Sequence, residues 1–559
     1  MEFDLRELIQ VEGIFVLGVI LSVLVLAVSV GIGIWARRLT RNIGDYFVAG
    51  RSIGALNNGL AMVSLGLSLT TFIGLTALIM ELYYVAVAVY CAFTAAFIGL
   101  LVLAAPFLRQ HKSFTTMAFI SERYYSRNLR IMSVVVMLVV SFIYLAGNIK
   151  GIGIVFEFLL DVPQFWGILV GGLIITIYVT FGGMYGVTYN QTFQTIVLLF
   201  CLMFPVAIIL RELGAAGWFF PPLGYGGDLI NTMVDVNPVY FWPMAVHPGV
   251  YIAVFLGSFF GIIGLPHFVM RYFTVRDAKE ARWSTVLCVF LIGLINLTVY
   301  ATGFAAVTFM RQEGITVPAE AFDYMVFVLT ESLAGSTWLA IAIAGSVAAG
   351  LSTVAGLLMI MGAGLVHDLY GSLNPDVPDE KKLKLSYAAM LICGIVVTIF
   401  SLNPPEFILK AIMWAFGIAA ASLGVPIVLG IWWKRTTKEG AGAGMVFGFF
   451  TTFICFIAVE VMGILPVNLP IPFIAKYLYE PGGFMKIMAF TVPLSFIITV
   501  VVSWFTKEPP DSVKMQVDSM HGWPDYEEKR YNGKGLPVTI IILSILVMVF
   551  MTLLYDTFA

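Results

Sequence analysis

Long apolar runs, separated by short polar segments, follow one another along almost the whole chain. Each run is close to the roughly 20 helical residues that cross a hydrocarbon core about 30 Å thick. The pattern therefore predicts an all-α polytopic membrane protein with about 14 spans. The approximate ranges of these spans are 15–35, 54–80, 82–108, 131–160, 164–182, 190–211, 250–270, 283–310, 335–366, 386–402, 406–433, 441–462, 484–505 and 537–555.

The lysines and arginines gather in alternate loops between these spans. Short cytoplasmic loops of membrane proteins are enriched in both residues. If the residues before the first span lie outside the cell, most of the 31 basic residues fall on the cytoplasmic side. We therefore expect a multi-pass protein of the cell inner (plasma) membrane with both termini outside.

The composition excludes several classes of protein. Hydrophobic residues make up 60% of the chain and charged residues 11%, with a formal net charge of −2. Such a chain is neither a soluble enzyme nor a nucleic-acid-binding protein. All five cysteines fall inside predicted spans, without the spacing of a metal site or a disulfide framework. No nucleophile and base, and no set of metal ligands, gather at the span ends, so we do not expect an enzyme.

Two of the apolar runs contain residues that weaken a helix. In a membrane, a broken helix is tolerated only where its freed backbone groups are buried or line a cavity. Paired breaks in corresponding positions of two halves indicate a transport site between two repeats, although small residues also allow close helix packing. The interrupting residues are Ser64, Gly66, Ser68, Thr70 and Thr71 in range 54–80, and Gly257, Ser258, Gly261, Gly264 and Pro266 in range 250–270.

The two interrupted runs each open a group of five spans, and these groups would have opposite orientations. We expect one additional span in residues 1–45 and a transport core in 46–435. The repeats of this core would cover about 54–211 and 250–433, and residues 436–559 would add three spans and a cytoplasmic loop at 506–536.

Four segments resemble the sodium/solute symporter family, and most of all its acetate and short monocarboxylate permease branch. They are TFGGMYGVTYNQTFQ at 180–194, GLPHFVMRYFTVRDAKEAR at 264–282, AAGLSTVAG at 348–356 and VHDLYG at 366–371. The resemblance extends over roughly residues 40–440. It implies a leucine-transporter-type five-plus-five inverted repeat, with one extra N-terminal and three extra C-terminal helices, and Na+ as the coupling ion.

Oxygen atoms from two helices would bind the sodium ion. Carbonyls freed at a helix break and hydroxyls of a facing helix are the usual ligands inside a membrane. Ala349, Ser352 and Thr353 share one face of the ninth span, and the resemblance pairs them with carbonyls at Ser64 and Leu67. Alternatively, the two hydroxyls bond back to their own preceding turn.

A second ion position, implied by some relatives, needs hydroxyls one turn later and an aspartate on the sixth span. Here these places hold Ala355, Gly356 and Gln191, and Gln191 follows Asn190. None of them supplies a carboxylate, so we expect a single sodium ion.

The substrate site is predicted at the two breaks. The Ser68, Thr70 and Thr71 hydroxyls and nearby amides can hold a carboxylate much as helix N-termini hold anions. The remaining candidates for this site are Asn148, Lys150, Gly257 and Ser258.

Lys150 is a charged residue inside the fourth span, and such residues usually mark a function or a partner. It would pair with the substrate, or it would extend outward or pair with Glu157 instead. For His267, at the inner end of the seventh span, a structural role is favoured over a proton relay.

These features predict a sodium-coupled symporter that imports a short-chain monocarboxylate, such as acetate, propionate, lactate or pyruvate, by alternating access. Its partners would be the substrate, the sodium ion and membrane lipid. A symporter of a neutral or zwitterionic solute, such as proline or a sugar, is the nearest alternative. A membrane sensor that uses a transporter fold is a more distant one.

Overall fold

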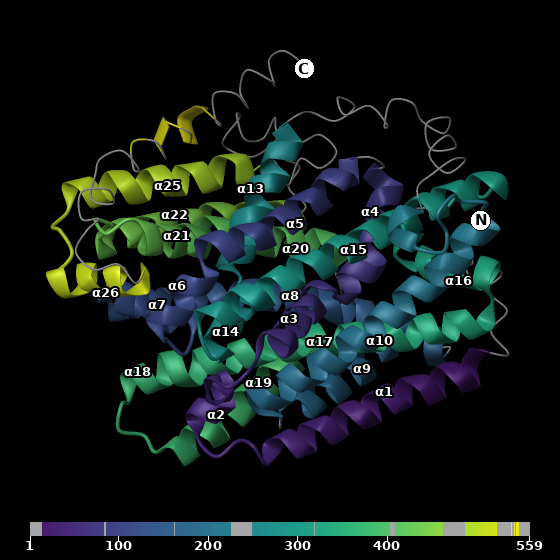
Figure 1. Cartoon of the computed structure of the whole chain (residues 1–559), viewed down its shortest axis with the longest axis horizontal. Helices are drawn as coiled ribbons and strands as arrows, with labels where there is room; N and C mark the ends of the chain where they lie inside the picture. The colour runs from purple at the N-terminus through teal and green to yellow at the C-terminus, as the bar shows by residue number, and fades with distance from the viewer. Residues whose placement is uncertain are drawn as a thin grey trace.

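The chain folds as a bundle of long helices (Figure 1). The computed structural model describes residues 14–82, 85–160, 162–180, 182–224, 249–317, 319–402, 408–461 and 487–521, with a few positions between 538 and 546. Within these ranges the regular elements are helices, apart from an isolated bridge between Ile53 and Val275.

Thirteen of the predicted spans correspond to helices, whereas most of the range 537–555 lies outside the described residues. In chain order they are α1 (Ile14–Arg37), α3 (Ala55–Gly66) with η4 (Thr70–Gly74) and α4 (Leu75–Leu82), α5 (Val85–Leu103) with α6 (Ala105–His111), α8 (Arg127–Leu160), α9 (Gln164–Thr180), α10 (Gly183–Glu212), α13 (Gly249–Gly264) with α14 (Pro266–Thr274), α15 (Ala278–Gln312), α17 (Ser336–Ala363) with η7 (Gly364–Tyr370), α19 (Asp379–Phe400), α20 (Ile408–Ala419) with η8 (Ala420–Gly424) and α21 (Val425–Trp432), α22 (Lys438–Phe456) with η9 (Ile457–Val461), and α25 (Met488–Phe505).

Short helices connect these spans. They are α2 (Ile43–Val48), η3 (Ala49–Arg51), α7 (Thr116–Arg123), η5 (Pro221–Leu223), η6 (Ala319–Tyr324), α16 (Met325–Ala334), α18 (Gly371–Leu373) and α26 (Asp511–His521). Among the described residues, nine helices are long and apolar enough to cross a membrane, and three bent pairs bring this number to as many as twelve. The chain is therefore a multi-pass membrane protein.

The two predicted breaks are confirmed. The helix axis bends by 55° between α3 and α4 and by 43° between α13 and α14. At the second break Leu265 has an extended backbone and Pro266 begins α14. A third bend, of 44° between α5 and α6, was not predicted. It follows from Pro106, because proline lacks an N–H and its ring collides with the preceding turn.

Packing between the helices repeats from one half of the bundle to the other. In the first half, α3 packs against α10 and α15; in the second half, α13 packs against α20, η8 and α5. The first helix of each five-span unit thus contacts the fifth helix of its own unit and the second helix of the other. The third helices, α8 and α17, contact each other, as do the fourth helices, α9 and α19. These pairs match the expected inverted repeat.

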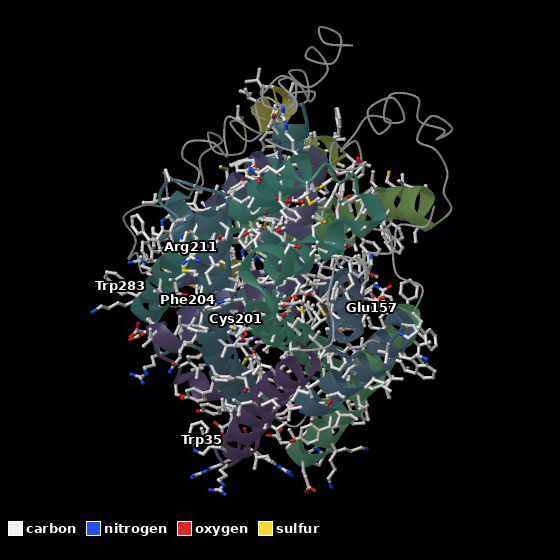
Figure 2. The ribbon with its side chains drawn as sticks, turned by 90° about the vertical axis from the view of Figure 1, so that its right-hand side faces the viewer. Trp35, Glu157, Cys201, Phe204, Arg211 and Trp283 are labelled. Atoms are coloured by element: carbon white, nitrogen blue, oxygen red, sulfur yellow. The ribbon has the colours of Figure 1, made fainter. Side chains whose placement is uncertain are left out.

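Large apolar side chains cover the outside of the bundle. Trp35, Phe204 and Trp283 lie at its periphery when it is viewed along the helices (Figure 2), and 49%, 51% and 59% of their surfaces are exposed. An apolar exterior is stable only against lipid, because water would not solvate it.

Polar contacts fasten the two broken helices together at the end where α3 begins. The Ile53 amide donates to the Thr274 carbonyl at 3.2 Å. From α6, the Arg109 guanidinium donates to the carbonyls of Val275 at 2.7 Å and Arg276 at 2.6 Å. Carbonyl groups at the end of α14, which have no partner within the helix, are thereby satisfied.

Candidate functional site

The break after α3 frees backbone groups in the middle of the bundle. Leu67, with φ −90° and ψ 68°, leaves the helical conformation directly after Gly66. The Thr71 hydroxyl reaches back across the break and donates to the Gly66 carbonyl at 2.6 Å. Ser64 and Leu67 are fully buried, and Ser68 is 1% exposed. The break therefore presents backbone oxygens to the interior rather than to lipid.

The ninth span, α17, places its predicted ion ligands against this break. The Ser352 hydroxyl donates to the Ser64 carbonyl at 2.9 Å and to the Ala349 carbonyl at 2.8 Å. The Ser352 hydroxyl thus bonds back to its own preceding turn, as the alternative interpretation expects, and it also contacts the facing helix. The Thr353 and Ser64 hydroxyl oxygens are buried and have no hydrogen-bond partner in the described part of the chain. Uncharged, unused oxygens in a dry interior fit a sodium ion.

Gln191 of α10 connects this cluster to the second broken helix. Its side-chain nitrogen donates to the Ser352 carbonyl at 2.7 Å, and its side-chain oxygen accepts from the Arg271 guanidinium of α14. Arg271 is 1% exposed and also donates to the Thr188 hydroxyl at 2.8 Å. The Ser352 carbonyl, next to the predicted ion site, thus accepts from the Gln191 amide. The buried Arg271 guanidinium in turn donates to that amide and fixes its orientation.

The other residues at the second ion position supply no acid. Asn190 faces α1, where its side-chain nitrogen donates to the Ser29 carbonyl at 3.1 Å. A Cβ atom on Gly356 would collide with the Leu65 side chain at 2.5 Å, so this glycine permits close packing of α17 against α3. Ala355 is buried and carries no polar group.

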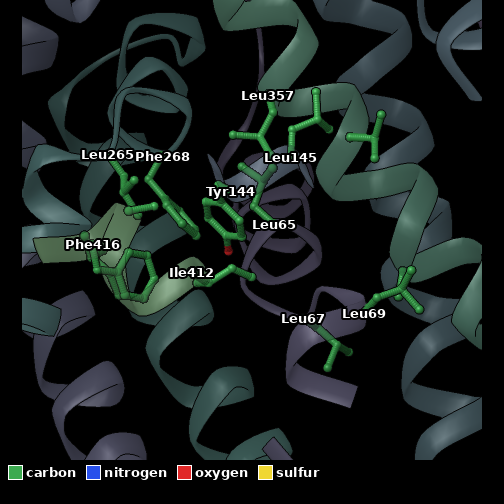
Figure 3. Packing of buried hydrophobic residues seen from close by; sticks show 14 of the residues in the cluster. Leu65, Leu67, Leu69, Tyr144, Leu145, Leu265, Phe268, Leu357, Ile412 and Phe416 are labelled. Carbon is green, nitrogen blue, oxygen red and sulfur yellow. The ribbon is translucent and has the colours of Figure 1, made fainter. Parts of the chain in front are cut away.

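A small cavity lies beside the break, between the two broken helices. Its volume is about 30 Å³, and four polar side chains line it: Ser68, Thr71, Tyr144 and Asn296. The rest of the lining is apolar and strongly aromatic, with Phe93, Phe97, Phe268 and Phe416 among its members. In Figure 3, Phe268 and Phe416 lie on one side of Tyr144, and Leu65 and Leu67 lie on the other. Ile412 lies below Tyr144 in this view.

Two of the predicted substrate residues, Ser68 and Thr71, therefore meet at one cavity. Thr70 begins the η4 turn, but its side chain lies outside the described residues. Asn148 lies one turn from Tyr144 and donates to the Tyr144 carbonyl at 3.0 Å, and its own side-chain oxygen is buried without a described partner.

The structure does not bring Gly257 and Ser258 to this cavity lining. A Cβ atom on Gly257 would collide with Met488 at the start of α25, so this glycine permits close helix packing. The Ser258 hydroxyl is buried, and its oxygen has no hydrogen-bond partner in the described ranges.

Lys150 has an acidic partner that the sequence did not indicate. Its ammonium nitrogen lies 3.4 Å from the Asp323 carboxylate of η6, and the two residues are 8% and 2% exposed. Glu157, the partner considered from sequence, accepts from the Tyr324 hydroxyl at 3.0 Å. The connection η6 is therefore attached to the C-terminal half of α8 through two carboxylates.

Sequence reasoning missed Tyr144 and Asn296 as cavity residues. Asn296 is an amide inside an apolar span, which is the same signal that singled out Asn148. It donates to the Thr94 hydroxyl at 3.0 Å, which fixes its orientation at the cavity. Tyr144 gives no comparable signal, since aromatic residues are frequent throughout the chain.

His267 lies behind the cavity wall. Its ring contacts Tyr144, with centroids 5.3 Å apart, and Phe268, with centroids 4.7 Å apart. Both ring nitrogens are buried and have no hydrogen-bond partner among the described residues. The expected choice between a structural role and a proton relay stays open.

Comparisons with known proteins agree with this geometry. The model of the sodium:solute symporter family matches residues 46–448. Among solved structures, a substrate-bound, outward-open Na+-coupled sialic acid symporter is similar, with a TM-score of 0.70 at 16% identity over 88% of this chain and 98% of that chain. This likeness confirms the leucine-transporter-type fold. A manganese transporter of Eremococcus coleocola, solved with an aromatic bis-isothiourea substituted compound, matches over 93% of this chain and 100% of its own at 12% identity, with a TM-score of only 0.45.

Proposed function

Because the chain belongs to the sodium:solute symporter family, we propose that the solute it imports with sodium is a short-chain monocarboxylate such as acetate, propionate, lactate or pyruvate. Family membership makes the protein a sodium-coupled transporter and not an enzyme. The identity of the solute, the site residues and the transport cycle are our proposals.

The cavity beside the α3 break carries the proposal. Its 30 Å³ is room for roughly two water molecules, since one needs about 10–15 Å³ measured this way. A space of this size is closer to a carboxylate with a methyl or ethyl group than to a sugar. The aromatic lining suits a short apolar tail, and the four polar side chains suit a small polar head.

The positive charge that a carboxylate needs would come from the sodium ion itself. No charged side chain is among the described residues that line the cavity, yet the proposed ion ligands Ser64 and Leu67 lie four residues and one residue before Ser68. A sodium ion there would attract a carboxylate held by the Ser68, Thr70 and Thr71 hydroxyls and by amides at the start of the outer half-helix. Each ligand would then increase affinity for the other, which is the coupling that symport requires.

Alternating access would follow from the same elements. The contacts of Ile53 and Arg109 hold α3 and α14 together at one end, which by the distribution of basic residues is the cytoplasmic end. Sodium would connect α3 to α17 while these contacts hold, and loss of the ion would free α3 to move. Both termini would then lie outside the cell.

A neutral or zwitterionic solute such as proline is the second candidate. It is favoured by the absence of charged side chains from the cavity lining. Transport of such a solute with one sodium ion would move net charge, whereas transport of a monocarboxylate anion would not.

Uptake of labelled solutes into proteoliposomes tests the proposal. We expect an inward sodium gradient to drive accumulation of labelled acetate or propionate. An excess of unlabelled lactate or pyruvate should compete, and proline or glucose should not. Competition by proline but not by the acids would contradict the monocarboxylate assignment and favour the second candidate.

A further inference from the structure

A second hollow lies on the outside of the bundle, where α5 and α6 meet the first turns of α15. Its volume is about 540 Å³. Val102, Phe107 and Val286 contribute to an apolar wall, and Lys279, Arg282 and Trp283 form a polar and aromatic rim. We call this hollow the α5–α15 groove. It is separate from the transport cavity and shares none of its lining residues.

The two cations of the groove lack a charge partner among the described residues. Lys279 and Arg282 are three residues apart on α15 and so lie on one face. Both are exposed, and within the described ranges neither side chain has an ion pair or a hydrogen bond.

The acids nearest to these cations are engaged elsewhere. The Asp277 carboxylate caps α15 by accepting from the Glu280 amide at 2.8 Å. The Glu280 carboxylate accepts from the Ala55 amide of the neighbouring helix. The described residues that line the groove include these two cations and no acid.

The wall of the groove is suited to hydrocarbon rather than to water. Trp283 is 59% exposed and Val102 is 57% exposed, and Figure 2 shows Trp283 at the edge of the bundle. The rise of 1.5 Å per residue puts Val286 only about 10 Å deeper along α15 than Lys279. The cations thus lie at the depth of headgroups, with tryptophan at the interface and aliphatic side chains at the depth of acyl chains.

We propose that the α5–α15 groove binds an anionic phospholipid of the cytoplasmic leaflet. The headgroup phosphate lies between Lys279 and Arg282, and an acyl chain follows Val102 and Val286. Basic pockets between spans on the cytoplasmic side bind anionic lipids in this way. The assignment to the cytoplasmic leaflet rests on the orientation proposed above. The bound lipid lies beside α6, whose Arg109 holds the end of the broken helix α14.

Lipid binding to the purified full-length protein in detergent tests the proposal without measuring transport. Fluorescent phosphatidylglycerol is titrated, with phosphatidylcholine of the same chain length as the neutral probe. We expect phosphatidylglycerol to bind more tightly than phosphatidylcholine. The double variant with Lys279→Gln and Arg282→Gln should bind phosphatidylglycerol roughly 10- to 30-fold more weakly, at about 1 kcal/mol for each basic residue. Binding of phosphatidylcholine should change less than twofold.

A matched control removes two exposed cations from the same end of the bundle, with Arg127→Gln and Lys381→Gln. We expect this control to bind phosphatidylglycerol like the wild type. A variant with Trp283→Ala tests the aromatic part of the rim and should weaken binding of both lipids. Soluble glycerophosphate should not displace the lipid. Equal losses of phosphatidylglycerol affinity in the groove variant and in the control would overturn the proposal. So would wild-type affinity in a groove variant that elutes as a monodisperse protein. Displacement by glycerophosphate would overturn it too, because the groove would then bind a free phosphate.

Discussion

Among single residues, the proposed ion site depends on a few uncharged oxygens between α3 and α17. Ser352 contacts the Ser64 carbonyl directly, and the Thr353 and Ser64 hydroxyls are buried without a described partner. Unused buried polar atoms are costly unless a ligand satisfies them. A sodium ion coordinated here would satisfy them and would join the two helices.

The first prediction removes two of these oxygens. In the variant with Ser352→Ala and Thr353→Ala, the sodium concentration for half-maximal uptake should rise by at least roughly 10- to 100-fold, because the loss of even one contact of a charged group costs about 1.5–3 kcal/mol. Ser346→Ala is a suitable control, since that buried hydroxyl of α17 donates only within its own helix, to the Ala342 carbonyl at 2.9 Å. Unchanged sodium dependence in the folded double variant would refute the proposed ion site.

The second prediction concerns Gln191, which positions the Ser352 carbonyl. Gln191→Leu would leave this carbonyl and the Arg271 guanidinium without their shared partner, so we expect apparent sodium affinity to fall roughly 3- to 10-fold. Gln194→Leu is the matched control on the same helix, because Gln194 is equally buried and contacts the Ser29 hydroxyl of α1 instead. Sodium titrations of uptake compare the two variants. If both lose sodium affinity equally, Gln191 has no specific role in the ion site.

At the scale of elements, the connection between α15 and α17 is attached to α8. The Lys150–Asp323 pair joins η6 to the C-terminal half of α8, in a region where neither charge is well solvated. Helix geometry places Lys150 about 9 Å along α8 from Tyr144 and roughly 240° around its axis. The contact with the substrate carboxylate that the sequence suggested for Lys150 and its contact with Asp323 in the structure therefore need to be separated by experiment.

The third prediction makes that separation. Lys150→Met alone should reduce the amount of folded protein and its uptake, because it leaves the buried Asp323 carboxylate without this cation, a change that costs about 3–5 kcal/mol in comparable cases. Adding Asp323→Leu should restore most of the folded protein. Substrate affinity of the double variant then measures any direct contact between Lys150 and the carboxylate. A double variant that is less stable than the single variant would contradict a stabilising pair.

The helices could be predicted from the sequence more completely than the site could. Lipid imposes long apolar segments, so the hydrophobic runs located the described spans and the glycines and prolines located two of the three bends. Contacts between distant segments leave no such trace. Asp323 is 173 residues from Lys150 along the chain, and nothing in either local sequence connects them. The cavity residues Tyr144 and Asn296 were missed for the same reason, since only helix packing brings them to the α3 break.

At the scale of the whole molecule, the repeated packing of the two five-span units leaves the broken helices between them. Sodium and solute would bind where these units meet, and opening at either end would follow from movement of one group of helices against the other. If the protein has the single ion site that we propose, with Gln191 in place of a carboxylate, one sodium ion would accompany one monocarboxylate anion. Such a cycle moves no net charge.

The fourth prediction, and the most direct test of the account, is therefore the response of uptake to membrane potential. A potential does about 2.3 kcal/mol of work on each charge per 100 mV, so it should not affect an electroneutral cycle. In proteoliposomes with a fixed inward sodium gradient, an inside-negative potassium diffusion potential should leave the plateau of acetate or propionate uptake unchanged, while abolishing the sodium gradient should abolish accumulation. A plateau that rises with the potential would contradict the account, because a second cation or a neutral solute would then be carried.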